Sequence, residues 1–82
     1  SYDPEYGELK VAYGRQTVLG SSNKTISNLP FTASTSYSCS ANENASTSVQ
    51  YNYGVAIGSA SAMTLYNYHG DNRTLNWLCV GY

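Results

Sequence analysis

The sequence predicts an all-β protein, a small six-stranded antiparallel β-sandwich. Three observations carry this prediction. No segment sustains the 3.6-residue hydrophobic period of an amphipathic helix. Val, Thr, Tyr and Ser, which favour strands or solvated strand faces, prevail between the turns. Turn signals recur along the chain, at Ser21-Ser22-Asn23, Asn42-Glu43-Asn44, Gly58-Ser59 and Gly70-Asp71-Asn72.

The 82 residues are enough for one domain at most. Residues 1–7, SYDPEYG, are interpreted as a connection to a missing upstream part of a longer chain. Residues 8–82 are interpreted as the sandwich domain itself. A domain of this size buries about 60% of its unfolded surface, so oligomerisation or a covalent link would help to stabilise it.

The first two strands are expected on either side of the first turn. Glu8–Arg15 alternates in polarity and is expected to end at Gly14. A short strand is expected around Ile26, and Pro30 ends it because proline cannot donate to a sheet ladder.

The third and fourth strands flank the polar segment in the middle of the chain. Tyr37–Ala41 places Tyr37, Cys39 and Ala41 on one face, because side chains alternate along a strand. Residues 45–58 are expected to form a longer strand that bends near Gly54.

The fifth strand is expected within residues 61–69, SAMTLYNYH. The alternation predicts that it presents Met63, Leu65 and Asn67 on one face. The opposite face holds Ala62, Thr64, Tyr66 and Tyr68.

The last strand, expected over Arg73–Tyr82, is apolar on both faces. One face holds Leu75, Trp77 and Cys79, and the other holds Leu78, Val80 and Tyr82. A strand that is buried on both faces packs against its own core and against something else. A second copy of the chain is one candidate for that second layer, and a loop of the same chain is the alternative.

Composition excludes several classes of partner. Charged residues make up 11% of the chain, the net charge is −1 and no basic run occurs, so a nucleic acid is not an expected partner. No apolar stretch approaches the ~18 residues of a membrane span, so membrane insertion is not expected.

Neither a metal, a cofactor nor catalysis is expected. The single His and the two distant cysteines cannot complete a four-ligand metal site. No nucleophile occupies an elbow-type motif, and positioned titratable groups for acid–base work are scarce. The sequence therefore predicts a protein that is not an enzyme.

The two cysteines, Cys39 and Cys79, both lie in expected strands. Their pairing as a disulfide and their burial as reduced thiols are equally consistent with these positions.

A candidate binding site lies in YHGDNR, at the turn before the last strand. Its residues supply an aromatic ring, an imidazole, a carboxylate, an amide and a guanidinium: Tyr68, His69, Asp71, Asn72 and Arg73. Sugars are recognised by hydrogen bonds from such groups while an aromatic face covers the apolar side of the sugar ring. In the alternative interpretation Asp71 and Arg73 pair with each other on the surface and His69 caps the turn.

The chain resembles the C-terminal tip domain of Mu-like phage tail fibres over residues 8–82. The matching features are Tyr13-Gly14 as an aromatic–glycine pair, Leu29-Pro30-Phe31 as a proline–aromatic step, and the ending Trp77–Tyr82. The same stretch is similar to H-type lectins, which are trimeric six-stranded sandwiches that bind N-acetylgalactosamine. Their aromatic–His pair before the final hairpin is matched by Tyr68-His69.

These resemblances imply a homotrimer of small sandwiches with binding loops at one end, where Tyr68 supplies the stacking ring and His69 a hydrogen bond. The implied ligand of a tail fibre is host lipopolysaccharide or another surface glycan, and a dedicated assembly chaperone is a further implied partner. The protein would be assembled in the cytoplasm of a bacterial host, as part of the virion tail fibre, and would act at the host cell surface. Cytoplasmic assembly favours reduced Cys39 and Cys79. A free-standing H-type lectin and a trimerisation cap that binds no ligand are the alternatives.

Overall fold

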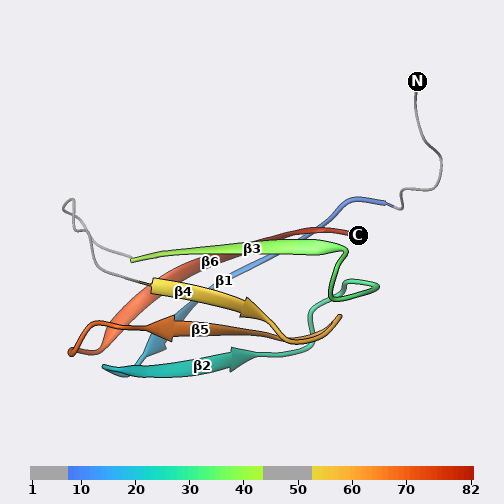
Figure 1. Ribbon diagram of the computed structural model, residues 1–82. Coiled ribbons are helices and arrows are strands. Elements are labelled where there is room, and N and C mark those ends of the chain that lie inside the picture. Colours follow the sequence, from blue (N-terminus) through green and yellow to red (C-terminus); the bar gives the residue numbers. More distant parts are fainter. Residues whose placement is uncertain (1–7, 44–52) are drawn as a thin grey trace.

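The computed structural model describes residues 8–43 and 53–82, and within these residues it contains six antiparallel strands and no helix (Figure 1). The all-β class and the number of strands are therefore confirmed. The strands are β1 (Lys10–Val18), β2 (Ser22–Ile26), β3 (Tyr37–Glu43), β4 (Tyr53–Ile57), β5 (Met63–Asn67) and β6 (Arg73–Gly81). Residues 1–7, expected to be a connection, lie outside the described residues.

The six strands form two three-stranded sheets. The order is β1-β6-β3 in the first sheet and β2-β5-β4 in the second, and every pair of neighbours is antiparallel. The central strand of each sheet is thus one of the last two in the chain. The chain passes from the first sheet to the second at a tight turn after Val18, where Ser21 adopts a positive φ of 52°.

Alternation along the strands buries one face of each sheet in a shared core. Met63, Leu65 and Asn67 of β5, which the alternation placed on one face, are all fully buried. The apolar core consists of Val18, Leu29, Phe31, Tyr37, Met63, Leu65, Leu75 and Cys79. The Tyr37 ring stacks on Phe31 at a centroid distance of 4.1 Å, and the Tyr37 hydroxyl donates to the carbonyls of Ser59 and Ala62.

Several strand ends differ from the prediction. The expectation that the first strand ends at Gly14 is wrong, because β1 continues to Val18 and Gly14 pairs with Trp77 in the middle of the ladder. Ser22 lies inside β2, where a loop was expected, since it pairs with Asn67 of β5.

The third and fourth strands also depart from the expected bounds. β3 runs two residues beyond Ala41 because Glu43 still pairs with Leu75 of β6. The first part of the expected strand over residues 45–58 falls outside the described residues, and β4 covers the part around Gly54.

The two cysteines form a disulfide, so the expectation of reduced thiols is wrong. Cys39 of β3 lies directly opposite Cys79 of β6 in the ladder, and their Cα atoms are 4.1 Å apart. Directly opposed residues of an antiparallel pair approach closely enough for their side chains to bond. The bridge ties the central strand of the first sheet to one edge strand.

The last strand is apolar on both faces, as expected. Trp77 packs against the core and Cys79 is buried within it, whereas Leu78 is 43% exposed on the outer face. Because Leu78 and Val80 pair with Tyr13 and Val11 of β1, the four side chains share that face and form an outer apolar strip. Within residues 8–43 and 53–82, Val11 and Tyr13 also remain largely exposed.

Candidate functional site

The hairpin between β5 and β6 is fixed by the buried side chain of Asn67, which is 1% exposed. Its amide nitrogen donates to the carbonyls of Val18 at 3.0 Å, Asp71 at 2.9 Å and Leu19 at 3.3 Å. Its amide oxygen accepts from the backbone N–H of His69 at 2.9 Å. Asn67 therefore joins the β1–β2 turn to the β5–β6 turn.

Backbone contacts bring the same two turns together. Ser21 N–H donates to the carbonyl of His69 at 2.8 Å, and Gly20 N–H donates to Oδ1 of Asn72 at 3.0 Å. Gly20 lies directly against the Gly70 carbonyl, so any side chain at Gly20 would collide with it. These contacts hold the turn that carries the predicted site in one conformation.

Arg73 points toward the interior at this end of the molecule. Its Nη1 lies 3.2 Å from Oε1 of Glu43, whose side chain is only 8% exposed. Its Nη2 lies 3.2 Å from Nε2 of His69 and 3.8 Å from Oδ2 of Asp71. The guanidinium charge is therefore shared between two carboxylates.

His69 and Asp71 are also tied to each other. The Asp71 backbone N–H donates to Nδ1 of His69 at 3.0 Å, and the Asp71 carboxylate lies 3.8 Å from the same nitrogen. Asp71 itself is exposed, with 78% of its side chain accessible, whereas the His69 side chain is 22% exposed. The turn thus presents a carboxylate at its tip and one edge of an imidazole below it.

Among the residues that the structure describes, Tyr68 is the most accessible aromatic ring of this end, at 62% exposure. It lies nearly parallel to the ring of Tyr66, with centroids 5.9 Å apart and an interplanar angle of 11°. Both rings lie on the face of β5 opposite Asn67, as the alternation predicted. Tyr68 lies over Gly54 of β4, where an added Cβ would be 3.2 Å from the Tyr68 ring. We call Tyr66 and Tyr68 the tyrosine platform.

The structure thus brings together all five residues predicted from the sequence, but in different roles. Tyr68 and Asp71 face solvent, and His69 is partly accessible. Asn72 and Arg73 hold neighbouring elements in place.

Sequence reasoning missed two residues that organise this end. Glu43 was assigned to a turn, and its pairing with Arg73 depends on the register of β3 against β6. Asn67 could have been found, since a polar residue on the apolar face of a strand just before a turn points to a buried hydrogen-bonding role.

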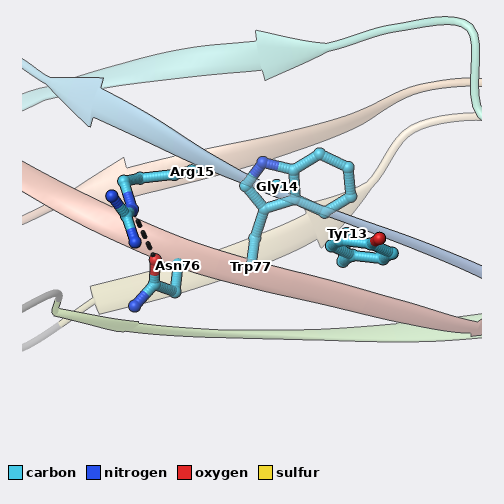
Figure 2. Close-up of a pocket in the computed structure, with 5 residues that line it drawn as sticks. All are labelled: Tyr13, Gly14, Arg15, Asn76 and Trp77. Carbon is cyan, nitrogen blue, oxygen red and sulfur yellow. Dashed lines mark hydrogen bonds between the residues drawn. The ribbon is translucent and has the colours of Figure 1, made fainter.

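A second concave surface lies on the first sheet, away from the hairpin (Figure 2). It has a volume of about 460 Å³ and is lined by Tyr13, Gly14, Arg15, Asn76 and Trp77. Figure 2 shows the indole of Trp77 crossing β1 at Gly14, with Arg15 and Tyr13 on either side. We call this concave surface the indole groove. Sequence analysis did not bring these residues together, because residues this far apart in the chain meet only through the β1–β6 register.

Across residues 8–43 and 53–82, no group of three His, Cys, Asp or Glu side chains is arranged to hold a metal ion. The same residues include no helix of the length and hydropathy that a membrane span requires.

Comparisons with known proteins give no relative: no protein-family model, no curated protein and no solved structure matches the chain.

Proposed function

We propose that this chain is the receptor-binding tip domain of a phage tail fibre, which attaches the virion to lipopolysaccharide or another glycan on the host surface. The observation that supports this best is the tyrosine platform, whose exposed Tyr68 directly precedes the turn in which Asp71 and His69 are hydrogen-bonded to each other. An exposed ring beside fixed polar groups is the arrangement that sugars require. The proposal also rests on the resemblance described above.

Each site residue takes a role that follows from its contacts. Tyr68 covers the apolar face of a sugar ring, and the Asp71 carboxylate accepts hydrogen bonds from sugar hydroxyls. His69 adds a polar contact at the edge of the site. Asn72 and Arg73 keep the turn in place, so ligand binding costs little ordering of the protein. The site binds and performs no chemistry.

We further propose that the domain is a homotrimer, in which copies meet through the outer apolar strip. Single apolar side chains on a surface are ordinary, but four that adjoin across two paired strands suit a contact between copies. Three weak sites on one rigid tip bind a repetitive glycan surface with a much higher overall affinity than one site does, because they bind it at the same time. Assembly would occur in the cytoplasm of the bacterial host, with a tail-fibre chaperone as an additional partner.

The test compares binding of the labelled protein to Gram-negative cells that carry full lipopolysaccharide and to cells that lack its outer sugars. The site variant is Tyr68→Ala, which removes an exposed ring and leaves the core untouched. Lys24→Ala, an exposed change on β2, is the matched control. We expect binding that needs the outer sugars, is lost in Tyr68→Ala and persists in Lys24→Ala. Equal binding by both variants would refute the hairpin site.

A free-standing H-type lectin is the second candidate, and the Cys39–Cys79 disulfide favours it. Disulfides persist in oxidising compartments and are rare in cytosolic proteins, where a tail fibre is assembled. The lectin predicts that the chain is retained by immobilised N-acetylgalactosamine and eluted by the free sugar. It also predicts that thiol titration of the natural protein finds neither cysteine free.

A further inference from the structure

We propose that the hairpin site continues along β5 onto the outer face of the second sheet, where Tyr66 and Asn23 bind a second sugar, so that the ligand is an uncharged oligosaccharide. This inference rests on the proposed function, because it assigns the ligand class of the same site. It can nevertheless fail while the proposed function holds.

The tyrosine platform provides an aromatic ring for each of two neighbouring sugars. Tyr66 and Tyr68 lie on the same face of β5, nearly parallel, with their ring centroids 5.9 Å apart. This separation is close to the length of one pyranose unit in a glycan chain. Because an aromatic face covers the apolar side of a sugar ring, the platform suits two successive sugar units.

The strands on either side of β5 leave the outer face open around the platform (Figure 1). Tyr66 lies between Asn23 of β2 and Gly54 of β4. An added Cβ at Gly54 would be 3.2 Å from the ring of Tyr68, so the missing side chain lets that ring lie across β4. The next row of the face consists of small side chains, those of Thr25, Thr64 and Ala56. A sugar can therefore lie against the platform without meeting a bulky neighbour.

Asn23 supplies the polar contact for the second sugar. It lies directly opposite Tyr66 in the ladder, so the two side chains share a face and their Cβ atoms are about 5 Å apart. Asn23 is exposed, and within residues 8–43 and 53–82 no hydrogen bond involves its side chain. Its amide offers both donors and an acceptor to sugar hydroxyls. Tyr66 and Asn23 thus repeat the combination of ring and polar group that Tyr68 and Asp71 provide at the turn.

The charges of the hairpin end favour an uncharged ligand. The Arg73 guanidinium lies 3.2 Å from Oε1 of Glu43 and 3.8 Å from Oδ2 of Asp71, so its charge is balanced within the protein. The accessible charge of the turn is the Asp71 carboxylate, whose side chain is 78% exposed and which repels an anionic sugar. Lys24 belongs to the opposite face of β2, because side chains alternate along a strand. Phosphorylated and acidic sugars are therefore disfavoured.

Competition for binding to Gram-negative cells that carry full lipopolysaccharide tests the ligand class. The competitors are short oligosaccharides cut from the purified outer polysaccharide of these cells, the monosaccharides from its complete hydrolysis, and the phosphorylated inner-core oligosaccharide of cells that lack the outer sugars. We expect the short oligosaccharides to compete at molar concentrations at least about tenfold lower than the monosaccharides, because they add the contacts of Tyr66 and Asn23. The phosphorylated oligosaccharide should not compete.

Variants of β2 decide whether Asn23 takes part. In calorimetric titrations with the same short oligosaccharides, Asn23→Ala should bind about fivefold more weakly or worse, whereas its affinity for the monosaccharides should stay unchanged. Ser22→Ala is the matched control, a neighbouring exposed change on the opposite face of β2, and should bind like the parent protein. Tyr68→Ala should lose the binding of both kinds of sugar.

The outcomes separate this inference from the proposed function. If the parent protein binds neither kind of cell, both fail. If it binds the cells but monosaccharides compete as well as oligosaccharides, or Asn23→Ala binds like the parent protein, the proposed function stands and the extended site is refuted. Competition by the phosphorylated oligosaccharide, or an outer polysaccharide that contains acidic sugars, overturns the uncharged ligand. An Asn23→Ala variant with altered sedimentation and unaltered affinity assigns this face to contact between copies.

Discussion

Asn67 is a polar residue, yet it stabilises the β5–β6 hairpin from a fully buried position. The two N–H groups of this buried amide are shared among three backbone carbonyls, and its oxygen accepts from one backbone N–H. These backbone groups would otherwise lose their water without replacement. The turn that presents Tyr68 and Asp71 is thereby positioned from below by a residue that never meets solvent.

Replacing Asn67 by Ala should therefore destabilise the fold. We expect the free energy of unfolding to fall by about 3 kcal/mol, because several buried backbone groups lose their partner. Urea unfolding measures this loss. Asn23→Ala, an exposed change on β2, is the control and should stay within about 0.5 kcal/mol of the parent protein. Equal stability of the two variants would contradict this role of Asn67.

Ionisation of Tyr37 makes the fold less stable at alkaline pH. Burial raises the pKa of its hydroxyl above the ordinary value of 10.0, because the charged phenolate is poorly solvated in the core. The folded state thus holds this proton more tightly than the unfolded state. The stability that this provides is complete below about pH 10 and is lost as the pH rises through the raised pKa.

Tyr37→Phe isolates this effect. At about pH 7 the variant should be less stable by about 1 kcal/mol, because the two hydrogen bonds of the hydroxyl are lost. As the pH rises above about 10, the difference from the parent protein should shrink, since only the parent loses the contribution of Tyr37. Urea unfolding at both pH values measures the difference in the free energy of unfolding between the two proteins. The titration of the other tyrosines contributes equally to both and cancels. A difference that is constant with pH would rule out the shifted titration.

At the scale of elements, the pairing of β1 with β6 brings Gly14 under Trp77. Gly14→Ala should displace the indole and cost about 1–3 kcal/mol through overpacking. Gly70→Ala is the matched control, because an added Cβ there meets nothing within 4 Å and Gly70 has no positive φ. Thermal unfolding followed by tryptophan fluorescence should report a lower midpoint and a shifted emission for Gly14→Ala only. The same spectrum in both variants would contradict the close packing.

The disulfide joins β3 and β6 across a separation of 40 residues. In the chain-entropy description, closing a loop of this length stabilises the fold by about 4 kcal/mol. A reducing agent should therefore lower the urea midpoint of the parent protein substantially. The double variant Cys39→Ala/Cys79→Ala should unfold at a low midpoint that the reducing agent does not change. If the reducing agent leaves the urea midpoint of the parent protein unchanged, the hydrogen bonds of the β3–β6 ladder hold these strands without the disulfide.

The presence of the strands, and which side chains share a face, could be predicted because apolar and polar residues alternate along the sequence, as around Met63, Leu65 and Asn67. The ends could not, since Ser22 and Glu43 are turn-type residues that remain in strands through partners far away in the chain. The five predicted site residues are neighbours in sequence, which is why they could be found together. Glu43 and the indole groove depend on long-range register, which no local pattern specifies.

At the scale of the whole molecule, the outer apolar strip should decide the oligomeric state. Leu78→Lys places a charge at its centre and should convert a trimer to monomers, because a charge in an apolar contact loses its water without a partner. Sedimentation velocity measures the change. Asn23→Lys, a charge on the other sheet, should leave the trimer intact. A parent protein that sediments as a monomer, or a Leu78→Lys variant that stays trimeric, would refute this interface.

The strand order has a consequence for how the chain is made. β1 and β3 flank β6, and β2 and β4 flank β5, so four edge strands leave the ribosome before either of their central partners. Neither sheet can form its ladder during most of synthesis, and the contacts that close the fold join residues as distant as Lys10 and Gly81. Such long-range pairing is slow to form and leaves strand edges exposed meanwhile. The nascent chain is thus a natural client for a protective factor, and the strands of the first sheet can pair only after β6 has been translated.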